Sequence, residues 1–153
     1  MNEKTNIITE LKNELEFINK ALLTLKHAYD HCKKIGIKDN YSFEELDKWE
    51  ALTARFSRIS DITTQKIMNS ILIIEKGFSG SLIDKANFAE QNDFVTNSEE
   101  FINLRLLRNY IAHEYSRQAT NEIFEKVMNS YDLLLSFVNA VTTYCNTRLF
   151  VKR

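Results

Sequence analysis

The chain has 153 residues, of which 44% are hydrophobic and 27% charged, so it can build one folded core and is not a disordered chain. It contains 3 glycines and no proline, which are too few turn residues for an all-β or Rossmann-type fold of this length. Long helices with few connections are therefore expected. The formal net charge of −1 argues against a protein that coats nucleic acid non-specifically.

The sequence also bears on where the protein works. No apolar run approaches the roughly 20 residues that a membrane-spanning helix needs, and no apolar signal-peptide block follows residues 1–5. The two cysteines, Cys32 and Cys145, are too few for a disulfide framework or a structural zinc site. We therefore expect a cytoplasmic protein with reduced thiols and no membrane partner.

Apolar periodicity predicts an all-α fold, an antiparallel bundle of four main helices and one short helix in a single domain covering residues 1–153. The first helix is expected over residues 5–34, where apolar residues recur at alternating steps of four and three. This stripe consists of Leu11, Leu15, Ile18, Leu22, Leu25, Tyr29 and Cys32. Lys33 and Lys34 suit the C-terminus of this helix, and Gly36 interrupts the pattern.

Capping signals mark the next two helices. Ser42-Phe43-Glu44-Glu45 has the pattern of a capping box and opens a second helix that ends near Lys76, before Gly77. Its apolar stripe consists of Leu46, Trp49, Thr53, Phe56, Ile59, Thr63, Ile67, Ile71 and Ile74. A short helix is expected over residues 81–91, followed by a polar loop through residue 97.

Two further helices complete the predicted bundle. Ser98, Glu99 and Glu100 open the fourth, because acidic residues are favourable at a helix N-terminus. The fifth is expected over residues 121–148. Its apolar positions are Phe124, Val127, Met128, Tyr131, Leu134, Leu135, Val138 and Val141.

The fourth helix differs from the others because it has two distinctive faces. One side carries Leu104, Leu107 and Ile111, and the opposite side carries Ile102, Leu106, Asn109 and His113. The first face is ordinary bundle packing. The second indicates another buried surface, such as a subunit interface.

The fourth helix also carries residue types that can act on a phosphodiester without a metal ion. A histidine such as His113 can take or return a proton, and an arginine such as Arg108 can hold two phosphate oxygens. Asn109, one turn before His113, can orient the imidazole or bind a phosphate oxygen. Together these groups can promote attack of an RNA 2′-hydroxyl on the adjacent phosphate, the step that metal-free ribonucleases use.

Spacing alone leaves a purely structural interpretation open. Arg108 and His113 lie about 140° apart on an ideal helix, so they do not share a face. In this interpretation Arg108 forms a salt bridge, His113 is an interhelical polar group, and Tyr115 packs against its neighbours.

The pattern Arg-x4-His-x-Tyr, formed by Arg108, His113 and Tyr115, resembles the motif of the HEPN superfamily. The surrounding residues 106–115 are similar to the HepT-like toxins of the HepT/MntA toxin–antitoxin modules, including the asparagine after the arginine. The resemblance implies an HEPN-like homodimer whose two motif helices meet in a composite ribonuclease site, with Arg108 and His113 as catalytic residues.

The resemblance further implies a partner protein. Tyr115 would accept AMP groups from a cognate MntA-type nucleotidyltransferase antitoxin, and the added anion would block RNA by bulk and charge. Because His113 and Tyr115 are two residues apart, they point to different sides of a continuous helix. We therefore expect either that the helix ends near Tyr115 or that the second subunit brings the groups together.

Two earlier positions complete the set of candidates. Asp61, on the second helix, can hold Arg108 or His113, since HEPN proteins often add a polar residue from an earlier helix. The alternative for Asp61 is an ordinary surface ion pair. His27 and His31 have a metal-ligand spacing, but no third ligand completes a set, so we expect an exposed pair and no metal or other cofactor.

The sequence therefore predicts the toxin of a toxin–antitoxin module, a metal-independent endoribonuclease that acts on RNA. An alternative is a non-catalytic HEPN module that binds a nucleotidyltransferase or presents a substrate to it. A plain helical interaction domain is a third interpretation. The intact motif favours the enzyme.

Overall fold

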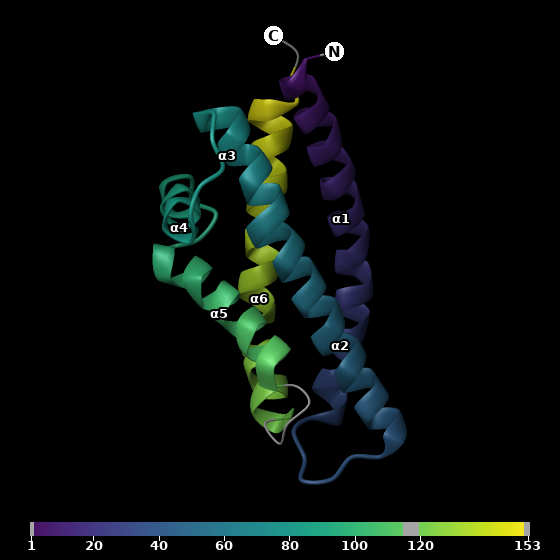
Figure 1. The fold of residues 1–153 in the computed structure, drawn as a ribbon. Coiled ribbons are helices and arrows are strands. Elements are labelled where there is room, and N and C mark those ends of the chain that lie inside the picture. Colours follow the sequence, from purple (N-terminus) through teal and green to yellow (C-terminus); the bar gives the residue numbers. More distant parts are fainter. Residues whose placement is uncertain (1, 115–119, 152–153) are drawn as a thin grey trace.

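The computed structural model describes residues 2–114 and 120–151, and these residues contain helices and no strand. Four long helical segments and one short helix form an antiparallel bundle, so the predicted fold class is confirmed (Figure 1). The elements are α1 (Glu3–Ile35), α2 (Phe43–Asp61), η1 (Ile62–Ile67), α3 (Met68–Lys76), α4 (Leu82–Gln91), α5 (Ser98–Glu114), α6 (Thr120–Tyr144) and η2 (Cys145–Leu149). The elements α2, η1 and α3 form one continuous helical segment, as do α6 and η2.

Local capping explains where the helices begin. The Ser42 hydroxyl accepts a hydrogen bond from the Glu45 backbone N–H at 3.1 Å, and the Glu45 carboxylate accepts one from the Ser42 N–H at 3.0 Å. The predicted capping box is therefore present. At α5 the cap lies one residue before the predicted opening, because Asn97 Oδ1 accepts from the Glu100 N–H at 3.1 Å.

The predicted apolar stripes form one shared core. In α1, every stripe residue except the half-buried Tyr29 is buried, and the Tyr29 ring stacks on Tyr131 of α6 at 3.8 Å between centroids. Trp49 of α2 stacks on Phe124 at 4.6 Å. The loop after α4 is less polar than predicted, because Phe94 and Val95 are 2% and 5% exposed and anchor it to the core.

The second long segment departs from a regular α-helix. The sequence predicts an α-helix through to Lys76, whereas residues Ile62–Ile67 form a π-helix. A π turn accommodates an extra residue, and here Thr63, Thr64 and Ile67 are all buried. The Thr64 hydroxyl donates to the Ser60 carbonyl at 2.6 Å, which gives that carbonyl a partner where the helical hydrogen-bond pattern changes.

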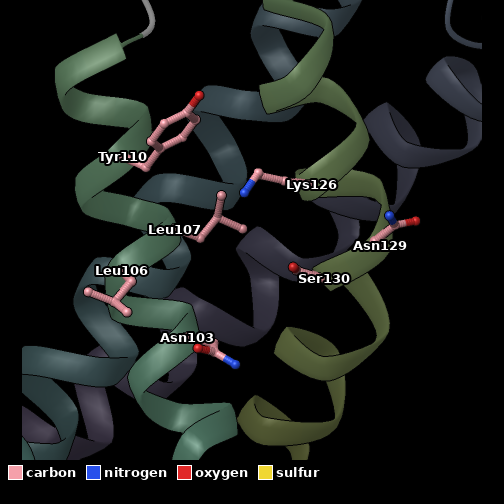
Figure 2. A pocket seen from close by; sticks show the side chains of 7 residues that line it. All are labelled: Asn103, Leu106, Leu107, Tyr110, Lys126, Asn129 and Ser130. Carbon is pink, nitrogen blue, oxygen red and sulfur yellow. The ribbon is translucent and has the colours of Figure 1, made fainter. Parts of the chain in front are cut away.

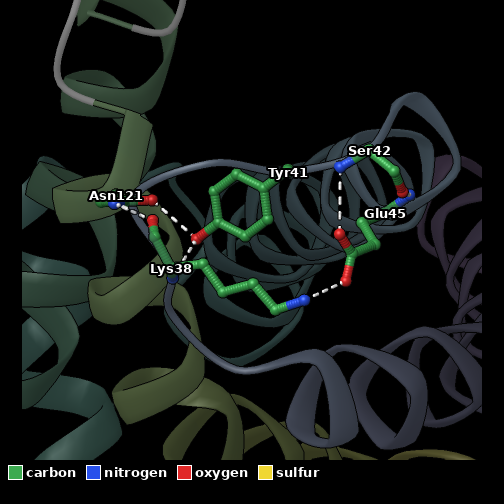
Figure 3. A network of polar contacts seen from close by, with 5 residues as sticks. All are labelled: Lys38, Tyr41, Ser42, Glu45 and Asn121. Atoms are coloured by element: carbon green, nitrogen blue, oxygen red, sulfur yellow. Dashed lines mark hydrogen bonds and ion pairs between the residues drawn. The ribbon is translucent and has the colours of Figure 1, made fainter.

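A polar network fixes the connection between α1 and α2 to the start of α6 (Figure 3). Tyr41 Oη donates to Asn121 Oδ1 at 2.7 Å, and Asn121 Nδ2 donates to the Lys38 carbonyl at 2.7 Å. Lys38 also pairs with Glu45 of the capping box beside Ser42. The lower end of the bundle in Figure 1, where α5 ends and α6 begins, is thus tied to the α1–α2 connection.

Candidate functional site

Three charged side chains meet between α2 and α5. Asp61 Oδ1 lies 3.0 Å from Arg105 Nη1 and 3.2 Å from Arg108 Nε. Asp61 is the last residue of α2, immediately before the π-helix, while the two arginines are one turn apart on the same edge of α5. The structure therefore brings Asp61 to Arg108, one of the two partners considered for it.

The two arginines differ in burial. The side chain of Arg105 is 11% exposed, against 33% for Arg108 and 42% for Asp61. Arg105 also lies 3.4 Å from the Thr64 hydroxyl in the π-helix. Arg105 thus anchors the carboxylate from inside, and Arg108 extends from it toward solvent. Arg105 is not among the residues predicted from the sequence, although its position three residues before Arg108 places both on one edge of α5.

A third cation lies on the inner side of this cluster. Lys85 of α4 is 7% exposed, and its Nζ lies 3.4 Å from Gln65 Oε1 in the π-helix. Burial lowers the pKa of Lys85, and the positive charge of Arg105 lowers it further. Lys85 forms no salt bridge with any residue of the described ranges. The surroundings of Asp61 therefore carry more positive than negative charge.

The geometry of Arg108 leaves part of its guanidinium available. Its ion pair with Asp61 is made at Nε, and the Arg108 side chain is 33% exposed. Because the guanidinium is planar and rigid, an ion pair at Nε fixes the direction of the other two nitrogens. Those two nitrogens can hold two oxygens of a phosphate.

The remaining predicted site residues lie away from this cluster. His113 and Asn109 are exposed on α5, and neither has a side-chain hydrogen bond or ion pair with a described residue. The structure does not bring either of them to Asp61. Tyr115, the predicted AMP acceptor, lies outside the described residues.

The second face of α5 borders an open groove against α6 (Figure 2). The groove encloses about 430 Å³ and is lined by Leu106 and Tyr110 from α5 and by Lys126 and Asn129 from α6. Leu106 is 56% exposed, and Lys126 Nζ lies 5.2 Å from the centre of the Tyr110 ring. The two predicted faces of α5 are only partly separate, because Leu107 of the first face also lines the groove and Ile102 of the second face is half-buried against the core.

The remaining candidates are two histidines and two cysteines, and their surroundings do not indicate a functional site. His27 and His31 lie with ring centroids 4.5 Å apart, and partial burial and the neighbouring His27 lower the pKa of His31. No group of three or more His, Cys, Asp or Glu side chains within the described ranges is arranged to hold a metal ion. Burial raises the pKa of Cys32 to about 11 and that of Cys145 to about 12, so neither thiol is poised as a nucleophile.

Comparison with known proteins adds no assignment. No protein-family model, curated protein or solved structure matches the chain. Among the described residues, no helix combines the length and apolar character needed to cross a membrane.

Proposed function

We propose that this protein is the toxin of a toxin–antitoxin module and cleaves RNA without a metal ion, using Arg108 and His113 at a dimer interface. The observation that carries the proposal is the ion pair at 3.2 Å between Asp61 Oδ1 and Arg108 Nε. It holds the arginine of the Arg-x4-His-x-Tyr pattern beside α2 with its side chain 33% exposed, where the guanidinium can also contact a phosphate.

The chemistry divides between two residues. Neutral His113 accepts the proton of an RNA 2′-hydroxyl, whose oxygen then attacks the adjacent phosphorus. The bond to the 5′-oxygen of the next nucleotide breaks, and that oxygen receives a proton, which gives a 2′,3′-cyclic phosphate and a 5′-hydroxyl. Arg108 offsets the negative charge that builds on the phosphate oxygens, while Asn109 orients the imidazole of His113 or binds a phosphate oxygen.

The two catalytic groups are supplied by different subunits in this proposal. Asp61 directs Arg108 toward α2, whereas His113 lies about 140° around α5 on an ideal helix. A second copy that packs its α5 against the first brings the His113 of one subunit near the Arg108 of the other. The exposed face of α5 supports this arrangement, because Leu106 is 56% exposed there.

Control of the activity rests on Tyr115. Its hydroxyl attacks the α-phosphorus of ATP bound to an MntA-type nucleotidyltransferase antitoxin, pyrophosphate leaves, and AMP remains on the tyrosine. The added negative charge then repels RNA phosphates from Arg108. Both proteins would work in the cytoplasm, where the RNA is.

The test compares wild type, His113→Ala and His27→Ala on total RNA in the presence of EDTA. His27→Ala is a matched control, since it also removes an exposed histidine from a helix. We expect wild type and His27→Ala to cleave and to leave 2′,3′-cyclic phosphate ends, while His113→Ala loses at least a hundredfold in rate. Circular dichroism checks the fold, and mass spectrometry checks that Tyr115 is free of AMP.

Two outcomes would count against the enzyme. Equal cleavage by all three proteins would show a contaminating nuclease. No cleavage by any of them, with Tyr115 unmodified, would favour the non-catalytic module that binds a nucleotidyltransferase.

A further inference from the structure

A second feature is an open hollow between α1 and α2. The hollow encloses about 420 Å³ and is lined by Phe17, Lys20 and Thr24 of α1 and by Arg55 and Arg58 of α2. The hollow and the Asp61–Arg108 pair share α2, since Arg55 and Arg58 line the hollow and Asp61 forms the pair.

The hollow is basic in a chain whose net charge is −1. Lys20, Arg55 and Arg58 line it, and its walls contain no acidic residue. Neither Arg55 nor Arg58 forms a salt bridge with a residue in the described ranges. Lys20 pairs with Glu16 at 3.4 Å, but both side chains are more than two thirds exposed, so solvent screens the pair. Among the described residues, no direct ion pair therefore neutralises either arginine, although Arg55 also borders a neighbouring pocket that Glu44 and Asp47 line.

An aromatic ring lies among these cations. The Arg58 guanidinium lies 4.9 Å from the centre of the Phe17 ring, and Phe17 is 41% exposed. Arg55 is held in place because its Nη1 donates to the Thr24 carbonyl at 3.0 Å. Two arginines, one of them held by a hydrogen bond, beside a partly exposed ring suit a nucleotide, whose phosphate binds the cations and whose base stacks on a flat side chain.

The hollow is also close to the candidate site along the helix. Arg58 lies three residues before Asp61, which is about 4.5 Å along the axis and about 60° around it. Arg55 lies one further turn back on the same edge. An RNA strand whose phosphate is bound by Arg108 can therefore reach Arg58, which lies within one helical turn of Asp61.

We infer that the α1–α2 hollow is a second binding subsite for single-stranded RNA, in which Arg55 and Arg58 hold phosphates and Phe17 contacts a base. This inference rests on the proposed function in taking RNA as the ligand. In this inference the hollow binds the part of the RNA strand next to the cleaved bond, whereas Arg108 and His113 act on the cleaved phosphate itself.

The experiment measures binding separately from cleavage. A fluorescein-labelled single-stranded RNA is titrated with the full chain carrying His113→Ala, which prevents turnover, and anisotropy is followed at several salt concentrations. Adding Arg55→Ala and Arg58→Ala should weaken binding about tenfold and reduce the slope of log affinity against log salt by about 1.4, because each lost phosphate contact removes about 0.7. Lys4→Ala with Lys12→Ala, the same charge change elsewhere on α1, should leave both quantities unchanged.

A second variant separates stacking from charge. Phe17→Ala should weaken binding about tenfold without changing the salt slope, since the ring carries no charge. Arg58→Ala alone keeps the experiment informative if loss of the contact between Arg55 and Thr24 disturbs the fold, because Arg58 is exposed.

The results distinguish this inference from the proposed function. Unchanged affinity and salt slope in the Arg55 and Arg58 variants would overturn the subsite. AMP that binds wild type but not the double variant, with RNA affinity equal in both, would assign the hollow to a free nucleotide and would also overturn it. Loss of RNA binding in these variants, together with no cleavage by wild type, would keep the subsite and remove the ribonuclease.

Discussion

At the scale of single residues, we expect Asp61 both to orient Arg108 for catalysis and to stabilise the fold through its pair with Arg105. One substitution tests both effects. Asp61→Asn keeps the size of the side chain and removes its charge, so Arg108 loses its orienting partner. We expect kcat to fall about tenfold to a hundredfold with little change in KM, because the oriented guanidinium stabilises the transition state more than the bound substrate. We also expect the free energy of unfolding to fall by about 1 kcal/mol, since Arg105 is 11% exposed and loses its carboxylate.

The control for Asp61 comes from the same helix. Asp47 is exposed on α2 and forms no ion pair with a described residue, so Asp47→Asn should leave both stability and cleavage unchanged. Cleavage kinetics and urea unfolding measure the two effects. If Asp61→Asn lowers stability and leaves kcat intact, the pair with Arg108 is structural only.

The sequence could name most of these residues but not their contacts. Arg108 and His113 stand out because they form a motif within a few residues. That Asp61 faces Arg108 depends on how α2 packs on α5, and periodicity does not encode this packing. Arg105 and Lys85 could not be identified from the sequence for a related reason. Each is a charged residue whose burial is set by tertiary structure.

At the scale of elements, the packing of α4 on the π-helix buries Lys85. Because its folded-state pKa is lowered, the unfolded chain binds the proton more tightly, and wild-type stability rises with pH between that lowered pKa and 10.5. We expect Lys85→Met to raise the free energy of unfolding by about 1 kcal/mol at pH 7, since it removes a buried charge. The gain should shrink as the pH approaches 10.5.

Urea unfolding at pH 7 and near pH 10 checks this expectation. Lys76→Met replaces an exposed lysine on α3 and should change stability little at either pH. A Lys85→Met variant that is less stable than wild type at pH 7 would mean that the ammonium group makes favourable contacts that offset its burial.

The helices themselves were predictable because their signals are local. The stripe in α1 and the capping box at Ser42 depend on residues within one or two turns, and both are present in the structure. The π-helix was not predictable in the same way. Thr63 and Ile67 belong to the predicted stripe and are buried, and this spacing carries no signal for the change in the hydrogen-bond pattern.

At the scale of the whole molecule, the proposed composite site requires a second copy of the chain. Arg108 is turned toward Asp61, while His113 is exposed elsewhere on α5. The groove beside Leu106 offers a surface on which a second copy can pack (Figure 2). The two faces of α5 predict such a surface from the sequence, whereas the groove itself depends on how α6 packs beside α5.

The dimer can be tested with two exposed leucines. Leu106 is 56% exposed beside the groove, and Leu23 is 71% exposed on α1. In sedimentation velocity we expect wild type and Leu23→Lys to be dimers at micromolar concentration, whereas Leu106→Lys dissociates because a charge enters an apolar interface. Cleavage should fall with dimerisation in Leu106→Lys and persist in Leu23→Lys. A monomeric wild type that still cleaves RNA would rule out the composite site, because Arg108 and His113 would then act within one chain.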